Sequence, residues 1–403
     1  MLSRRSFLRS SAASAASLGS GISAARAANA PGVTDTEIKI GQTMPYSGPA
    51  SSVMGMIGRA EAPYFKMINE MGGVNGRKIN LISLDDGYNP SKTVEQVRRL
   101  VEQDQVAFIF SSTGTSPNLA VQPYLNDNKV PQLFVTSGAS SFGDPRRFPW
   151  TIGCYPSFQT EGHIYAKHIL ATKPDARIGV LYQNDLVGKE YLSGFRDSLG
   201  VDRSAMIVKE VSYEIGDPTV DSQITALQAA GPDTIFLATI AKFGGQAIRK
   251  IHDLGWSPTR YVCSSANTID AVLRPAGLEK SKGLISAGSF KDVTDPRWKD
   301  HADVKAYAGF IAKYMNPNAY AGPAVLGYLI GALLIDTLRR CGDDLSRDNI
   351  MRQATNIKDL ELPLLLPGIK VNTSPDNYFP IRQMQLERFN GVSWDYFGDL
   401  IGD

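Results

Sequence analysis

The chain of 403 residues has few of the side chains from which metal centres are built. It contains three cysteines, Cys154, Cys263 and Cys341, and four histidines. The cysteines match no metal-binding spacing, so we expect buried or half-buried thiols, although an oxidising compartment would permit a disulfide. His163 and His168 are five residues apart, whereas the two histidines of a helical zinc motif stand at i and i+4. The sequence therefore predicts no metal site.

The motifs of common nucleotide-binding and hydrolytic enzymes are missing as well. No Gly-x-Gly-x-x-Gly follows the first expected strand, and no Walker A loop, Gly-x-Ser-x-Gly elbow or His-Glu-x-x-His helix occurs. Asp85 and Asp86 form an acidic pair, but neighbouring strand residues point to opposite faces, so this pair is more typical of turn capping. We therefore expect no catalytic residue, no cofactor and no enzymatic activity.

Long apolar runs are also missing, since no stretch reaches the ~18 consecutive apolar residues that indicate a membrane-spanning helix. The first 30 residues instead resemble an export signal. Arg4 and Arg5 precede an Ala- and Ser-rich stretch at residues 10–25, and small-x-small cleavage sites follow at 25–27 and 28–30. We therefore expect a periplasmic protein, exported through a Tat-type or Sec signal peptide.

The apparent positive charge belongs to this signal. The whole chain carries 42 Lys and Arg against 40 Asp and Glu. The first 30 residues hold four arginines and no acid, so their removal leaves 38 basic and 40 acidic residues, a formal charge of −2. No cluster of basic residues is interleaved with aromatics, and the sequence therefore gives no indication of nucleic-acid binding.

Expected strands and helices alternate from residue 35 onward, which is typical of parallel, doubly wound sheets. The first series has strands at 38–44, 79–84, 106–110 and 132–136, with helices at 51–71, 93–103 and 119–125. A second series has helices at 158–171, 188–199, 220–230 and 243–254, with strands at 177–182, 207–213, 234–238 and 261–263. Helices at 304–315, 323–341 and 347–355 and strands at 369–371 and 381–389 complete the chain. A mature chain of about 370 residues is too long for a domain with one hydrophobic core, so we expect two α/β domains.

A loop of small hydroxyl residues, 111–118, follows the expected strand 106–110 and precedes a helix. Ligands of open α/β sheets bind outside the carboxyl ends of the strands, and the first amides of a helix lack partners within it. Thr113, Thr115 and Ser116 add hydroxyl groups there. The loop therefore predicts a site for a carboxylate, with simple N-capping of the helix by Thr115 or Ser116 as the alternative.

Several segments, taken in order, resemble the periplasmic solute-binding proteins of ABC importers, in the leucine/isoleucine/valine (branched-chain amino-acid) binding family. The resemblance covers about residues 35–399. It is carried by residues 38–41 (IKIG), 47–49 (SGP), 68–76 (INEMGGVNG), 85–86 (DD), 111–118 (SSTGTSPN) and 183–188 (QNDLVG). It implies a receptor that closes by a hinge on a small solute and delivers this solute to an importer permease. The receptor would contact the membrane only through this permease.

The resemblance also implies the type I architecture of two α/β lobes joined by three hinge crossings. We expect these crossings near Gly153, Ser286 and Pro367. The expected first lobe comprises residues 31–152 plus 287–366, and the second comprises 153–286 plus 367–403.

In this family the loops after the third and fourth strands hold the ligand's α-carboxylate. They correspond here to Gly114, Thr115 and Ser116, and to Gly138, Ala139 and Ser140. Small residues allow backbone amides to approach a carboxylate, and hydroxyl groups donate to it. The resemblance therefore implies a ligand that bears a carboxylate.

The other half of the expected site departs from the amino-acid pattern. Val53 or Met54, Val187 and Ile240 stand where family members place tyrosines. The segment with Ser264 and Ser265 has no acid where one binds the ammonium group, and a desolvated ammonium without a carboxylate is costly. The sequence therefore favours an amine-free acid with an apolar body, for example an aromatic carboxylate.

Three alternatives remain open. Glu161, Asp185 or Asp270 would restore amino-acid binding if one of them reached the cleft. A sensor would use the same two lobes without importing its ligand. A two-lobed enzyme is disfavoured by the export signal and the missing catalytic motifs.

Overall fold

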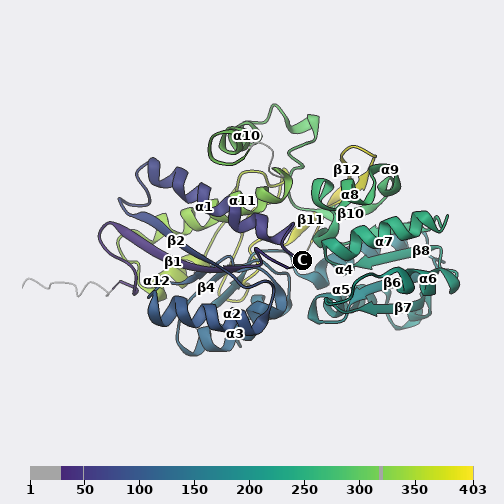
Figure 1. Ribbon diagram of the computed structural model, residues 1–403, viewed down its shortest axis with the longest axis horizontal. Coiled ribbons are helices and arrows are strands. Elements are labelled where there is room, and N and C mark those ends of the chain that lie inside the picture. Colours follow the sequence, from purple (N-terminus) through teal and green to yellow (C-terminus); the bar gives the residue numbers. More distant parts are fainter. Residues whose placement is uncertain (1–28, 49, 317–320, 403) are drawn as a thin grey trace, which may run out of the picture.

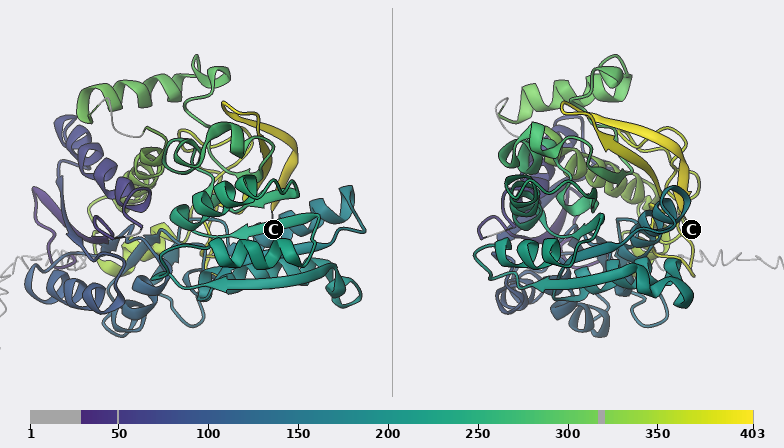
Figure 2. Two further views of the ribbon diagram at one scale, coloured as in Figure 1. Left: turned by 45° about the vertical axis from the view of Figure 1, so that its right-hand side comes forward. Right: turned by 90° about the vertical axis from the view of Figure 1, so that its right-hand side faces the viewer.

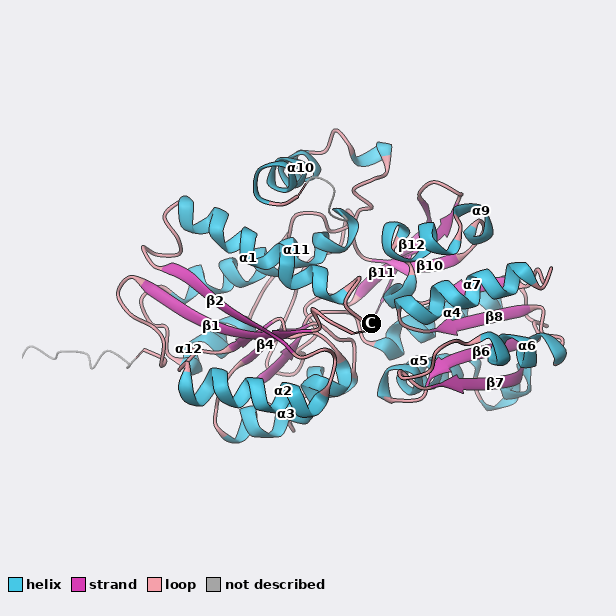
Figure 3. Cartoon of the chain, viewed as in Figure 1, coloured by secondary structure: helices cyan, strands magenta, loops and turns pink. Residues whose placement is uncertain are grey.

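The computed structural model describes residues 29–48, 50–316 and 321–402 (Figure 1). All but the last two residues of the expected export signal, 1–30, lie outside these described residues. Strands and helices alternate along both halves of the molecule, as Figure 3 shows. The strands form one sheet of five and one of seven, so the expected class, two doubly wound α/β lobes, is confirmed.

The sheet of lobe 1 is parallel throughout, in the order β2-β1-β3-β4-β5. Its strands are β1 Glu37–Met44, β2 Lys78–Asp85, β3 Ile109–Phe110, β4 Gln132–Val135 and β5 Thr151–Gly153. Its helices are α1 Met54–Glu70, α2 Pro90–Arg98, α3 Thr115–Asp127, α10 Ala302–Tyr314, α11 Ala321–Cys341 and α12 Arg347–Ala354. Figure 1 shows α1 and α11 on one face of the sheet and α2 and α3 on the other.

The sheet of lobe 2 has the order β12-β11-β10-β9-β8-β6-β7 and is parallel from β7 to β10. Its strands are β6 Ile178–Gln183, β7 Ile207–Tyr213, β8 Thr234–Ala238, β9 Thr259–Val262, β10 Ile285–Gly288, β11 Gln383–Phe389 and β12 Trp394–Gly402. Its helices are α4 Phe158–Thr172, α5 Leu186–Leu199, α6 Asp221–Ala229, α7 Ala241–Asp253, α8 Arg274–Ala276 and α9 Leu278–Ser281. The antiparallel strands β11 and β12, yellow in Figure 2, form one edge of this sheet.

Alternating strand residues explain why both faces of the lobe 2 sheet carry helices. On β6, Val180 packs in the cluster that contains α4 and α5, whereas Leu181 packs in the cluster that contains α6 and α7. Both side chains are fully buried. Such a strand reads as a continuous apolar run, which is the pattern of a parallel sheet covered on both faces.

The chain crosses between the lobes three times. It passes from β5 to α4, from β10 to the segment before α10, and from residue 382 into β11. Ile369, Val371 and Ile381 pack in the core of lobe 1. We therefore propose that the third crossing lies next to Gln383 rather than near Pro367, and that the first lobe extends to about residue 381.

Close contact between α1 and α11 places the first turn of α1 at the cleft. A Cβ atom on Gly327 would lie 2.3 Å from the carbonyl oxygen of Ile57. Only a residue without a side chain allows this approach. The glycine therefore fixes α1, and with it Met54, against the core of lobe 1.

Three further findings concern the cysteines, membrane-spanning helices and metal ligands. The three cysteines are buried and free. Among the described residues, no helix is both long and apolar enough to span a membrane, and no cluster of three potential metal ligands occurs.

Candidate ligand-binding cleft

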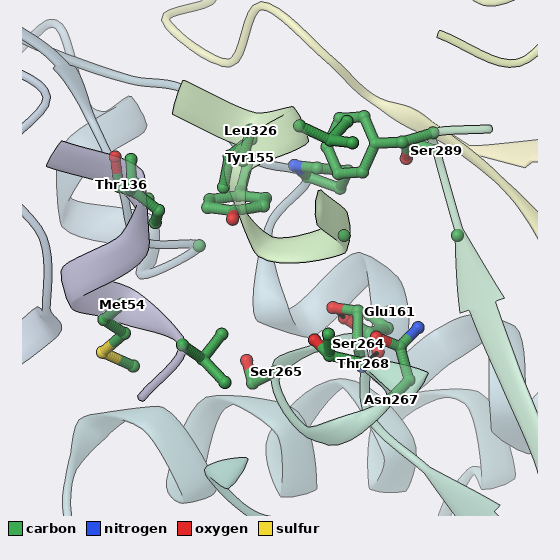
Figure 4. Close-up of a pocket in the computed structure, with 18 of the residues that line it drawn as sticks. Met54, Thr136, Tyr155, Glu161, Ser264, Ser265, Asn267, Thr268, Ser289 and Leu326 are labelled. Atoms are coloured by element: carbon green, nitrogen blue, oxygen red, sulfur yellow. Dashed lines mark hydrogen bonds between the residues drawn. The ribbon is translucent and has the colours of Figure 1, made fainter. Parts of the chain in front are cut away.

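A cavity of about 220 Å³ lies between the two lobes, at the carboxyl ends of their parallel strands. Figure 4 shows Met54 and Thr136 of lobe 1 on one side, and Ser264, Asn267 and Thr268 of lobe 2 below and across from them. Its position agrees with the rule that open α/β sheets bind ligands at these strand ends. The cavity is therefore the candidate site.

The loop after β3 forms one wall and carries the hydroxyl groups expected from the sequence. Gly114 precedes α3 with φ +107°, and the helix begins at Thr115 without any side-chain cap. Thr115 is buried, and its Oγ1 lies 2.7 Å from Oγ of Ser137. Neither Thr115 nor Ser116 caps α3, so the capping alternative is wrong.

Tyr88 lies against the same loop and was not expected from the sequence. A Cβ atom on Gly114 would approach its ring to 2.6 Å. The side chain is 8% exposed, and its hydroxyl group has no hydrogen-bond partner in the described part of the chain. Burial raises its pKa, so the hydroxyl keeps its proton. A buried donor without a partner is costly, and one that faces a cavity indicates a ligand acceptor.

The loop after β4 contributes less than expected. Gly138 lines the cavity together with Thr136 and Ser137. Ala139 and Ser140 do not line it. Ser140 instead donates its backbone N–H and its hydroxyl to the Glu190 carboxylate on α5, with the N–H at 2.9 Å.

Of the twelve residues expected at the site, nine line the cavity: Val53, Met54, Gly114, Thr115, Gly138, Val187, Ile240, Ser264 and Ser265. The other three are Ser116, Ala139 and Ser140. Ser116 instead contacts lobe 2, where its hydroxyl is 3.5 Å from Oδ2 of Asp185. For all twelve residues, a role as ligand contact remains a prediction.

Apolar side chains cover much of the remaining cavity wall. Val187 and Ile240, which replace tyrosines of the family pattern, are 3% and 2% exposed. Ile57, Leu326 and the aromatic rings of Tyr155, Phe158 and Phe290 also line the cavity. Such a wall suits the apolar body of a small solute.

Glu161 reaches the cavity from the first turn of α4 and is 3% exposed. Oε1 accepts from the Tyr165 hydroxyl at 2.6 Å and from the Ser264 N–H at 2.6 Å. Oε2 accepts from the Ser264 hydroxyl at 2.7 Å and from Tyr191 at 3.1 Å. A carboxylate has about four acceptor positions, so these four donors fill it. Burial nevertheless raises its pKa.

Three further carboxyl groups line the cavity: Asp270, Asp292 and Glu387. Asp270 accepts from Arg274 at 3.1 Å. Asp185 does not line the cavity, because it caps α5 by accepting from the Val187 N–H at 2.9 Å. Glu161 and Asp270 therefore reach the cleft, as one alternative required, whereas Asp185 does not.

Asp292 and Glu387 were missed because they follow or occupy short strands of lobe 2. Glu387 lies on β11, opposite Ser286 on β10 and Tyr396 on β12. It is 2% exposed, and burial raises its pKa to about 8. Nothing in the local sequence of β11 distinguishes this buried glutamate from a solvated one.

The model of the periplasmic binding protein family matches residues 37–391. A Leu/Ile/Val-binding protein homologue of Brucella melitensis is 24% identical over 72% of this chain and 77% of its own length. An amino acid binding protein of Pseudomonas aeruginosa is 23% identical over 60% of this chain and 64% of its own length.

Solved structures share the fold at lower identity. A branched-chain amino acid ABC transporter protein of Thermus thermophilus with bound valine superposes with a TM-score of 0.83, at 16% identity, over 92% of this chain and 98% of the other. A fatty acid ABC transporter substrate-binding protein of Thermomonospora curvata gives 0.78, at 18% identity, over 93% and 95%. The chain therefore belongs to the periplasmic binding protein family whose members serve ABC transporters and include the branched-chain amino-acid receptors.

Proposed function

We propose that this protein captures a small carboxylate-bearing solute by hinge closure and delivers it to the permease of an ABC importer. The observation that carries the proposal is the set of buried hydroxyl groups at the start of α3. Among the described residues the Tyr88 hydroxyl has no acceptor, and Thr115 and Ser137 line the cavity beside it. These donors and the amino end of α3 together offer an anion uncharged hydrogen bonds and the positive end of the helix dipole.

The solute has no ammonium group on the carbon next to its carboxylate. Glu161 is the acid best placed to hold such a group, but its acceptor positions are filled by Tyr165, Tyr191 and Ser264. An ammonium ion brought next to Glu161 would lose its water without gaining a free oxygen of that carboxylate. The apolar wall suits an aliphatic or aromatic acid.

Amino-acid binding is the second candidate. It is favoured by the presence of Glu161 and Asp270 at the cavity and by the names of the relatives. It would require Ser264 to turn its hydroxyl away from Glu161 as the ligand enters. Calorimetry distinguishes the two candidates through a matched pair.

The test compares 3-phenylpropanoate with phenylalanine, which differ only in the α-ammonium group. Hexanoate and leucine extend the comparison to an aliphatic body. The proposal expects a thermal shift and a calorimetric signal with the acids, since binding at a hundredfold excess over Kd stabilises a protein by ~2.7 kcal/mol. Binding of the amino acids alone would instead establish the second candidate.

Export of the protein is part of the proposal. Ala30 is buried, and its N–H donates to the Leu345 carbonyl oxygen at 3.0 Å. Asn29 accepts from the N–H of Leu345 at 3.2 Å. Cleavage after Ala27 would retain both contacts, so we expect a mature chain that begins at Ala28. Mass spectrometry of the exported protein tests this, and an intact Met1 would contradict it.

A further inference from the structure

We propose that the cavity contains a second polar subsite, formed by Asp292, Glu387 and the aromatic rings of Trp394 and Tyr396, which binds a positively charged group at the far end of the solute. This subsite rests on the proposed function, because it names the class of solute held at the same cleft. All four residues line the cavity. None of them belongs to the hydroxyl-bearing wall of lobe 1.

The two polar ends of the cavity lie on opposite sides. Glu387 accepts from the side-chain amide of Asn267 at 2.8 Å. Figure 4 shows Asn267 and Ser289 on the side of the cavity away from Thr136 and Met54. Glu387 is therefore at the far end from the loops that we expect to hold the carboxylate.

Asp292 keeps an unused carboxyl oxygen, and Glu387 is held by few partners. Oδ1 of Asp292 accepts twice from Thr294, whereas Oδ2 is buried and has no partner among the described residues. On Glu387, the hydrogen bond from Asn267 occupies Oε1. Glu387 is 2% exposed, so its carboxyl group is largely removed from bulk water. Buried acceptors of this kind are costly unless a ligand completes them.

The two carboxyl groups are close enough to influence each other. Burial raises the pKa of Glu387 to about 8, and the nearby charge of Asp292 raises it further in the same direction. Tyr396 is the cross-strand partner of Glu387, and burial, followed by the charges of both acids, raises the pKa of its hydroxyl. That hydroxyl donates to the Phe290 carbonyl oxygen at 2.7 Å. The same hydroxyl lies close enough to Glu387 to lower the pKa of that carboxyl group, though less than burial raises it.

The protein supplies no free cation to this end of the cavity. Of the described residues that line it, Lys291 is the only basic one. Its ammonium group is 2.6 Å from Asp303 and lies over the ring of Trp298. A ligand cation would thus meet two carboxyl groups without a competing lysine, and its charge would favour their ionised form.

The aromatic residues indicate a cation rather than a neutral donor. Trp394 is 4% exposed, and its indole N–H is already used by the Asn267 carbonyl oxygen at 3.2 Å. The face of such a ring attracts an ammonium group, and the attraction grows when the group is desolvated. Acidic oxygens and aromatic rings together therefore select a primary or substituted ammonium.

The solute inferred from both ends carries a carboxylate and an ammonium group separated by an apolar body. It differs from an α-amino acid, in which both charges stand on one carbon. It also differs from the amine-free acid expected from the sequence, because the sequence did not reveal Asp292 and Glu387 at the cavity.

The experiment titrates the mature protein with 4-(aminomethyl)benzoate, with 4-ethylbenzoate, which has the same shape without the charge, and with phenylalanine. We expect the aminomethyl acid to bind about tenfold or more tightly than the ethyl acid, as for other close charge pairs. Equal affinity for the two would overturn the subsite and leave the proposed function intact. Binding of phenylalanine alone would overturn both. Failure of all three to bind would contradict the subsite, since the aminomethyl acid provides both charges.

Two variants locate the effect. Glu387→Gln and Asp292→Asn keep the shape of the side chains but cannot ionise when the ligand's cation arrives, so each should reduce the preference for the aminomethyl acid severalfold while sparing the ethyl acid. Asp395→Asn is the control, because Asp395 lies on β12 beside the subsite but is 55% exposed and does not line the cavity. An equal loss in all three variants would overturn the inference.

Discussion

The carboxyl group of Glu61 lies in the core of lobe 1, on the buried face of α1. The residue is fully buried, accepts from the Gln42 amide through Oε2, and leaves Oε1 without a partner in the described part of the chain. Burial raises its pKa from 4.5 to about 8. The folded protein therefore binds this proton more tightly than the unfolded chain does.

The stability of the protein should consequently fall as the pH rises from about 4.5 to 8. The contribution of Glu61 is complete below the unfolded pKa and is lost as the pH passes through the folded pKa. Glu387, whose pKa is also raised to about 8, adds a slope of the same sign. Glu61→Gln should flatten the dependence of the melting temperature on pH, whereas Glu95→Gln, on an exposed position of α2, should not. A wild-type melting temperature that rises over this range would contradict the assignment.

Thr115 is the residue whose change tests the carboxylate site most simply. Thr115→Ala removes a hydroxyl group that we expect to bond to the ligand's charge, so binding should weaken by about 1.5–3 kcal/mol. The hydroxyl does not cap α3, but it is hydrogen-bonded to Ser137, so the free protein should also lose about 0.5–1.5 kcal/mol of stability. Ser91→Ala is the control, because Ser91 is exposed on α2 and does not line the cavity. Equal losses of affinity in the two variants would argue against a direct contact.

At the scale of elements, helices α4 and α5 pack closely enough to need glycine. A Cβ atom on Gly194 would lie 2.1 Å from the Gln159 carbonyl oxygen. Gly194→Ala should therefore destabilise lobe 2 by about 1–3 kcal/mol, although alanine is the better helix former. Gly216→Ala, where no heavy atom lies within 4 Å of the added carbon, should be neutral or slightly stabilising. Chemical denaturation measures both, and an unchanged Gly194→Ala protein would contradict this packing.

Most elements of the two lobes were predictable because buried parallel strands are continuous apolar runs and helices show their own period. The edge of lobe 2 was not. Strand β12 contains Asp395, Asp399 and two glycines, and most of its side chains are only partly buried or exposed. Asp and Gly have low strand propensity, so the strand depends on its pairing with β11. The segment 369–371 shows the opposite error, since it makes only an isolated bridge between Val371 and Leu360.

The same edge explains why half of the cavity was invisible in the sequence. Gly114, Thr115 and Gly138 follow strongly apolar strands, so their place at the strand ends could be inferred. Glu387 and Tyr396 enter the cavity through cross-strand pairing of residues whose neighbours look solvated. Only the assembled sheet brings these residues to the cleft.

At the scale of the whole molecule, the proposed function requires the lobes to move. Ser140 of the loop after β4 already contacts Glu190 of α5, and Ser116 of α3 contacts Asp185. A ligand that contacts both lobes adds to these contacts, so binding of the ligand should favour closure of the lobes. Small-angle scattering should show a smaller radius of gyration at saturating ligand. No compaction would count against hinge closure.

The central claim is that the cleft recognises a carboxylate through uncharged donors of lobe 1. Calorimetry tests it most directly, with the acid that gives the largest thermal shift compared with its own primary amide, which keeps the shape and removes the charge. The account predicts tight binding of the acid, at least about tenfold weaker binding of the amide, and a smaller difference in Thr115→Ala, because charged acceptors form the stronger hydrogen bonds. Equal affinity for acid and amide, unchanged by Thr115→Ala, would contradict it.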